Sequence, residues 1–137
     1  EREMDEFMRG RDARGIWRGA FIERMDLAYA AADVVVARSG AGTVSELCLV
    51  GKAVVFVPSP NVAEDHQTKN AMALADRGAA LVVPDREAVA RVFSEAGRLL
   101  ADDAMRSEME KNIRALAVAD SADRVADEIL KVVKRSE

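Results

Sequence analysis

The chain has 137 residues, and half of them are hydrophobic, which is enough to build one domain around a single apolar core. Its 24 acidic and 20 basic residues are interspersed and leave a formal net charge of -4, so there is no general electrostatic attraction to nucleic acid. A single cysteine, Cys48, excludes an internal disulfide and favours a reducing compartment such as the cytoplasm, while no apolar run reaches the roughly 18 residues of a membrane-spanning helix. The chain starts without an initiator methionine, in what reads as the tail of a helix, and we expect the natural protein to extend upstream.

The first half of the chain has the pattern of alternating strands and helices. Residues 15–17 read as a short strand, and the apolar spacing over residues 25–32 matches one face of a helix. The β-branched run at residues 34–37 is typical of a strand that is covered on both faces. A helix is predicted over residues 43–50, with Gly51 placed to end it in the left-handed conformation. These segments predict two strand-helix units in succession.

Two further strands are predicted in the middle of the chain. Residues 53–57 form a β-branched run that Pro58 must end, because proline has no N–H to donate to a sheet. A helix is predicted over residues 65–77, with Gly78 as its stop, and a fourth strand over residues 79–83.

The last third of the chain is helical by its apolar period. One helix is predicted with Val89, Val92, Phe93 and Ala96 on its buried face, a second through residues 105–116, and a third through residues 125–133. Strands that alternate with helices through short connections predict an α/β fold. We therefore expect a Rossmann-like parallel sheet with helices on both faces, in a single domain of residues 1–137.

In open α/β sheets ligands bind beyond the carboxyl ends of the strands, which directs attention to the loop after the second predicted strand. There Gly40, Ala41, Gly42 and Thr43 offer no bulky side chain and open a helix, whose free N–H groups and dipole favour an anion such as a pyrophosphate. The alternative is that the glycines only turn the chain tightly from strand to helix. The segment nearly matches the dinucleotide-binding fingerprint but has Ser45 at its last position, and the next strand lacks the acidic residue that would hold a ribose. A nicotinamide-dependent dehydrogenase is therefore disfavoured.

Glu46 has two interpretations. Residues 43–46 match a capping box, in which Thr43 is the N-cap and Glu46 reaches back to its backbone N–H. Alternatively, a carboxylate in the first helical turn accepts hydrogen bonds from the two ribose hydroxyls of a nucleotide whose phosphates lie at the same helix end. The same oxygens cannot fully serve both roles, and the pattern alone favours capping.

A second polar loop, residues 61–70, follows the third predicted strand and suits a polyhydroxyl ligand. The alternative is a plain helix N-terminus whose acidic residues complement the helix dipole. His66, the only histidine, has no partners at metal-ligand spacing, so no metal site is predicted. No nucleophile with an adjacent base can be assembled either, and Cys48 is expected on the buried face of its helix.

In combination these segments resemble the MurG family, the transferases that move N-acetylglucosamine from UDP onto the muramyl-peptide lipid intermediate of bacterial peptidoglycan. The resemblance rests on residues 20–33, 38–46, 57–61, 65–71 and 120–128. It implies a two-domain architecture of the GT-B type, of which this chain is most of the C-terminal, donor-binding half, without that half's first strand and glycine-rich turn.

The resemblance assigns donor contacts to several parts of the chain. Ile22 would offer its backbone to the uracil, and Glu46 would take the ribose hydroxyls. Gln67 occupies the place of a glutamine that faces the sugar, whereas His66 beside it departs from some members of the family. The residues expected to bind UDP-N-acetylglucosamine are Ile22, Ser39, Gly40, Ala41, Gly42, Thr43, Val44, Ser45, Glu46, His66, Gln67 and Asn70.

The reaction that the resemblance implies is an inverting displacement at the anomeric carbon. A general base activates the acceptor hydroxyl, and the helix end stabilises the departing UDP. The base and the contacts to the lipid-linked acceptor are expected in an N-terminal domain that this chain lacks, so we expect the chain alone not to catalyse transfer. No cofactor and no metal are implied, and the full-length protein is expected at the cytoplasmic face of the bacterial inner membrane.

Two other functions stay open at the level of sequence. One is another UDP-sugar enzyme of GT-B architecture, such as an epimerase or a different glycosyltransferase. The other is a non-catalytic nucleotide-binding or interaction module. Because parallel sheets are covered on both faces and paired at their edges, we also expect a fragment without its first strands to be marginally stable or self-associating.

Overall fold

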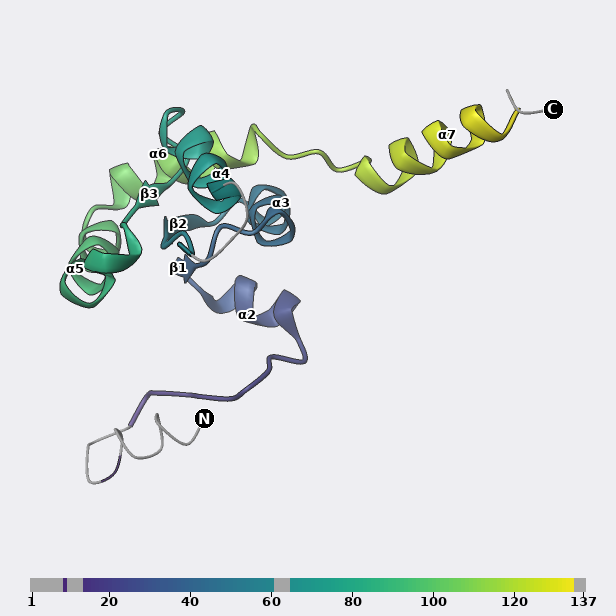
Figure 1. Cartoon of the computed structure of the whole chain (residues 1–137). Coiled ribbons are helices and arrows are strands. Elements are labelled where there is room, and N and C mark those ends of the chain that lie inside the picture. Colours follow the sequence, from purple (N-terminus) through teal and green to yellow (C-terminus); the bar gives the residue numbers. More distant parts are fainter. Residues whose placement is uncertain (1–8, 10–13, 61–64, 135–137) are drawn as a thin grey trace. The chain divides into compact units, whose positions relative to one another are not determined.

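The computed structural model of the chain describes residue 9 and residues 14–60 and 65–134 (Figure 1). By their contacts the residues form two units, Glu1–Ala31 and Ala32–Glu137. In the described part of the first unit the only helix is α2 (Met25–Ala31), in which Tyr29 is buried. The predicted strand at residues 15–17 is wrong, because Gly15 is in a turn at φ 77° and Trp17 is 70% exposed, with no strand paired to either.

The second unit contains a parallel sheet of three strands in the order β1 (Val34–Ala37), β2 (Ala53–Phe56) and β3 (Leu81–Val82). Val34 is in register with Ala53, and Val55 with Leu81. The predicted parallel sheet is confirmed. Strand β3 has two residues where five were predicted. Ala79 N donates to Leu74 O of α4, and Val83 lies beyond the paired register although its N–H donates to Phe56 O of β2. An apolar run in the sequence indicates that its residues are buried, but buried residues do not all pair as a strand.

Helices follow the strands in the predicted alternation (Figure 1). They are α3 (Ala41–Val50), α4 (His66–Ala75), the short 3₁₀ helix η2 (Asp85–Glu87), α5 (Ala88–Ala101), α6 (Asp103–Arg114) and α7 (Ser121–Lys134). Gly51 ends α3 at φ 66° and ψ 45° and donates its N–H to Leu47 O, which confirms the predicted left-handed stop. Among the described helices none is both long and apolar enough to cross a membrane.

The core lies on both faces of β2, whose four residues are all fully buried. Ala53 and Val55 belong to a cluster with Leu99 of α5 and Met109 of α6. Val54 and Phe56 point to the opposite face, since successive strand residues alternate, and they too have no exposed surface. Full burial of both residue sets means that both faces of the central strand are covered, as the predicted fold requires.

The predicted buried face of α5 is confirmed at Val92 and Ala96 and is wrong at Val89 and Phe93. Val89 is 98% exposed and Phe93 is 85% exposed, whereas Leu99 is fully buried and Val92 and Ala96 pack against the core. Two apolar stripes run side by side along this helix, and the sequence period does not say which of them the sheet takes. Packing selects the stripe of Val92, Ala96 and Leu99.

Candidate functional site

The candidate site is built at the carboxyl ends of β1 and β2, which meet at one edge because the strands are parallel. Residues 38–40 lead from β1 into α3, whose N-cap is Gly40. The first hydrogen bond of this helix runs from Val44 N to Gly40 O at 3.0 Å. The N–H groups of the three residues before Val44 therefore have no carbonyl within the helix, and they form its positive end.

Gly40 and Gly42 leave open space at this helix end. Gly40 has φ -64° and ψ 151°, a conformation that any residue can adopt, and Gly42 lies inside the helix. A Cβ added to either glycine would meet no atom within 4 Å. The backbone does not need glycine at these positions, so the tight-turn interpretation is not supported. What the glycines provide is unobstructed access to the helix N-terminus.

The capping-box interpretation of Glu46 is wrong. Helix α3 begins at Ala41, two residues before the predicted start, and its N-cap Gly40 makes no side-chain capping bond. Thr43 is consequently the third helical residue, and Glu46 is the sixth, in the second turn. Glu46 is exposed and lies four residues after Gly42, so both occupy the same, solvent-facing side of the helix.

Val44 and Ser45 occupy a different side of α3. Together with Cys48 of the same helix and Leu74 of α4 they line a hollow of about 250 Å³. Ala41 is exposed and Thr43 is half-buried. Burial raises the pKa of the Cys48 thiol, which agrees with the predicted inward position of this residue.

The second loop brings Gln67 to the same edge of the sheet. Residues 61–64 of the predicted loop lie outside the described residues, and α4 begins at His66 after Asp65 at φ 56°. His66 is exposed. The Gln67 side-chain Oε1 accepts a hydrogen bond from Ser59 N at 2.9 Å. This contact fixes the orientation of the amide and directs its two N–H donors, on Nε2, away from Ser59.

Ser39 and Asn70 join the two loops. Ser39 Oγ donates to Gln67 O at 2.8 Å, and Asn70 Nδ2 donates to Ser39 O at 3.2 Å. Ser39 has no exposed surface at all, so its hydroxyl acts within the protein. The predicted residue Ser39 is thus brought together with Gln67 and Asn70, which lie 28 and 31 positions away from it in sequence.

Arg38 begins the predicted donor-binding segment, but the sequence assigns no specific contact to it. Its Nη1 donates to Val57 O at 3.0 Å and to Pro58 O at 3.2 Å, and it is paired with Asp85 of η2. The sequence places Arg38 directly after a predicted strand, but nothing in it identifies Asp85, 47 positions away, as the partner of this arginine.

Ile22, the predicted uracil contact, belongs to the first unit and is 36% exposed there. Its backbone role stays a prediction. Within the described ranges, no three His, Cys, Asp or Glu residues gather in a way that could hold a metal ion.

Comparison with known proteins identifies the family. The model of the glycosyltransferase family 28 C-terminal domain matches residues 11–125. The UDP-N-acetylglucosamine–N-acetylmuramyl-(pentapeptide) pyrophosphoryl-undecaprenol N-acetylglucosamine transferase of Parabacteroides distasonis is 50% identical over 120 residues, which cover 88% of this chain and 33% of the relative. The protein of the same name from Porphyromonas gingivalis is 54% identical over 114 residues, which cover 83% of this chain and 30% of the relative.

A solved structure gives the same result for the fold. The crystal structure of Acinetobacter baumannii MurG superposes with a TM-score of 0.80 at 34% identity, covering 94% of this chain and 38% of that chain. The chain thus spans about one third of the length of these relatives. The predicted resemblance and the predicted Rossmann-like fold of a GT-B C-terminal half are both confirmed. This chain belongs to the glycosyltransferase family 28 C-terminal domains.

Proposed function

We propose that this chain binds UDP-N-acetylglucosamine as the donor-binding domain of a transferase that moves N-acetylglucosamine to a lipid-linked muramyl-peptide. The observation that carries the proposal is the open N-terminus of α3, with Gly40 and Gly42 leaving space and Glu46 exposed on the same side. The proposal agrees with the names of the relatives, which are half identical to this chain.

The diphosphate would lie at the N-terminus of α3. Its charge would be met by the N–H groups of the first turn and by the helix dipole, an arrangement that binds phosphates in many α/β proteins. No acidic residue lies in the first turn of α3 to compete with an anion. Glu46, one turn further along, would accept hydrogen bonds from the ribose hydroxyls.

The sugar would lie toward the second loop. Gln67 would present its Nε2 donors to an oxygen of the N-acetylglucosamine, since its Oε1 is already used by Ser59 N. His66, exposed beside it, is a second candidate for a sugar contact. Ser39 and Asn70 would act indirectly, because their hydrogen bonds hold the two loops together.

In the reaction we propose, the acceptor hydroxyl oxygen forms a bond to the anomeric carbon while the bond from that carbon to the UDP oxygen breaks. The hydroxyl proton passes to a general base in another part of the full-length protein, and the negative charge that develops on UDP is stabilised at the N-terminus of α3. Because the acceptor in the relatives' names carries undecaprenol, a lipid, the full-length protein would work at a membrane surface, in our proposal the cytoplasmic face of the bacterial inner membrane.

The test is calorimetric titration of the full-length gene product with UDP-N-acetylglucosamine. Glu46→Ala should weaken binding by about tenfold or more, because hydrogen bonds to a charged group are lost. Glu108→Ala, which removes an exposed carboxylate from α6, serves as the control and should bind like the wild type. Unchanged affinity in Glu46→Ala would reject the ribose assignment, and tighter binding of another UDP-sugar in a panel would replace the proposed donor.

A pair of glycine variants separates ligand space from backbone conformation. Gly40→Ala should leave stability within about 0.5 kcal/mol of wild type but weaken donor binding, because the new methyl group enters open space at the helix end. Gly51→Ala should do the opposite, since alanine at φ 66° costs about 1–2 kcal/mol and its Cβ would meet the Arg114 guanidinium. Urea unfolding and titration of both variants measure the two effects. Normal donor binding by Gly40→Ala would contradict the proposed diphosphate position.

A further inference from the structure

Arg38 holds backbone groups that the sheet leaves without partners. Among the described residues, the backbone bonds between β1 and the chain beyond β2 continue as far as Val57 N, which donates to Ala37 O at 2.9 Å, and Pro58 has no N–H to extend the ladder. Arg38 Nη1 supplies a donor to the carbonyls of both Val57 and Pro58. One nitrogen therefore ties the end of β1 to the loop that follows β2.

Asp85 fixes the guanidinium in that position. It is the first residue of η2, and it pairs with the same Nη1, whose two hydrogens are therefore shared among three acceptor oxygens. The Arg38 side chain is 54% exposed and that of Asp85 is 36% exposed, so the pair is too well solvated to add much stability by charge alone. Its effect is geometric: it determines where the Pro58 carbonyl lies.

The position of Pro58 determines the orientation of the Gln67 amide. The Pro58 carbonyl and the Ser59 N–H belong to one planar peptide group, so holding the carbonyl also aims the N–H. Ser59 N donates to Gln67 Oε1 at 2.9 Å. A continuous path thus runs from Asp85 through Arg38 and the 58–59 peptide to the side chain of Gln67.

We infer that Arg38 and Asp85 are positioning residues that orient the Gln67 amide toward the sugar of the donor. This inference rests on the proposed function. It adds a specific consequence: the pair acts on recognition of the sugar and leaves recognition of the nucleotide unchanged, because the α3 N-terminus and Glu46 lie outside this path.

The experiment compares binding of two ligands, UDP-N-acetylglucosamine and UDP, to the full-length protein. Asp85→Asn keeps the shape of the side chain and removes its charge, and Arg38→Lys keeps the charge but ends one bond short of the position of Nη1, which makes all of the contacts. Each variant should lose about fivefold to tenfold in affinity for UDP-N-acetylglucosamine while its affinity for UDP stays within about twofold of wild type. Arg86→Lys is the matched control, because Arg86 is adjacent to Asp85 but is paired with Glu87, and it should bind both ligands normally.

Gln67→Glu links the effect to the amide. It retains an oxygen for Ser59 N but loses the Nε2 donors, so it should show the same selective loss, and adding Asp85→Asn to it should cause little further loss. Equal weakening of both ligands by Asp85→Asn and Arg38→Lys would show a general structural role and overturn the inference, as would normal binding by both. If Gln67→Glu is selective while these two variants bind normally, the proposed donor site stands and the positioning role fails. A wild-type protein that binds neither ligand would reject the proposed function and the inference with it.

Discussion

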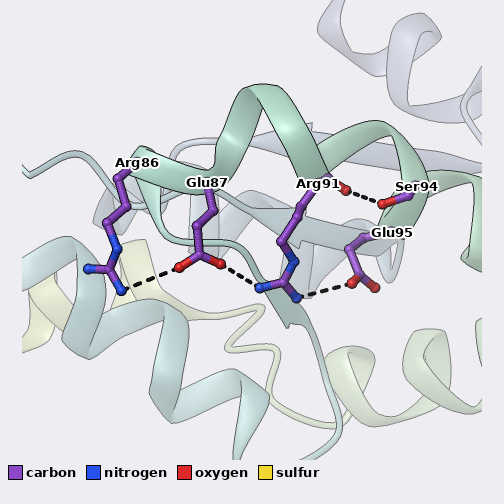
Figure 2. A network of polar contacts seen from close by, with 5 residues as sticks. All are labelled: Arg86, Glu87, Arg91, Ser94 and Glu95. Carbon is purple, nitrogen blue, oxygen red and sulfur yellow. Dashed lines mark hydrogen bonds and ion pairs between the residues drawn. The ribbon is translucent and has the colours of Figure 1, made fainter.

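Two polar networks lie next to each other in sequence at η2, and they are built in opposite ways. The site network joins the segment after β1, the loop after β2, α4 and η2 through residues 8 to 47 positions apart. The second network, shown in Figure 2, begins one residue after Asp85 and stays on η2 and α5: Arg86 contacts Glu87, Glu87 contacts Arg91, and Arg91 contacts Glu95. All of its bonds connect residues within four positions of each other.

The two networks differ in which parts of the structure their contacts can hold in place. Contacts at i+4 spacing on one helix recur wherever the charges are suitably placed, and they favour only the helix that carries them. Contacts that join strands, loops and helices fix the distances between elements. The site network can therefore shape a binding site, whereas the α5 network in Figure 2 serves the helix itself.

The largest expected difference in stability is between two serine-to-alanine variants, one in each network. Ser39 Oγ donates to Gln67 O and Ser94 Oγ donates to Arg91 O, both at 2.8 Å. Ser39→Ala should lower the free energy of unfolding by about 1–2 kcal/mol, because a buried bond between elements is lost. Ser94→Ala should leave stability unchanged or raise it by a few tenths of a kcal/mol, roughly the helix preference of alanine over serine. Urea unfolding of the two variants measures this, and equal losses would remove the distinction between the networks.

A smaller loss of stability is expected when a side-chain amide is replaced by a carboxylate, at Asn70 in the site network and at Asn112 outside it. Asn70 Nδ2 donates to Ser39 O at 3.2 Å in the site, and Asn112 Nδ2 donates to Gly78 O at 3.3 Å elsewhere. Asn70→Asp and Asn112→Asp should each cost about 1 kcal/mol, since a donor is replaced by an oxygen facing a carbonyl. Only Asn70→Asp should also weaken binding of UDP-N-acetylglucosamine. If the two variants bind the donor equally well, the site network does not shape the site.

Local features of the chain were predictable from sequence. The strand at residues 34–37 and the stop at Gly51 depend on β-branched residues and on one glycine, and both are confirmed. The expectation that this strand is covered on both faces is wrong, because Val36 is 49% exposed. The start of α3 was placed two residues late, because Thr43 and Glu46 form a capping pattern that competes with the plain glycine start at Gly40. The capping pattern is present in the sequence, but the helix starts at its N-cap Gly40 without using it.

Properties that depend on distant residues were not predictable in the same way. The sequence could not choose between the two apolar stripes of α5, because that choice is made by the sheet surface to which Leu99 packs. Nor could it show that Ser39 is fully buried or that Arg38 reaches Asp85. The family resemblance supplied the names of the site residues, but only the structure separates the exposed Glu46 from the buried Ser39.

The smallest expected effect concerns the charge ladder on α5. The hydrogen bond to Arg91 lowers the pKa of the Glu87 carboxyl, with smaller contributions from Arg86. A carboxyl whose pKa is lower in the folded state adds stability above its unfolded pKa of about 4.3, and that stability is lost as the pH falls through the folded value. Glu87→Gln should therefore melt slightly below wild type at pH 7, and the two melting curves should converge at pH 2, where the wild-type carboxyl is protonated. The difference should also shrink in 1 M salt, where screening acts over about 3 Å. A melting difference that persists at pH 2 would mean that Glu87 acts through its packing, and the ladder in Figure 2 would then owe little to charge.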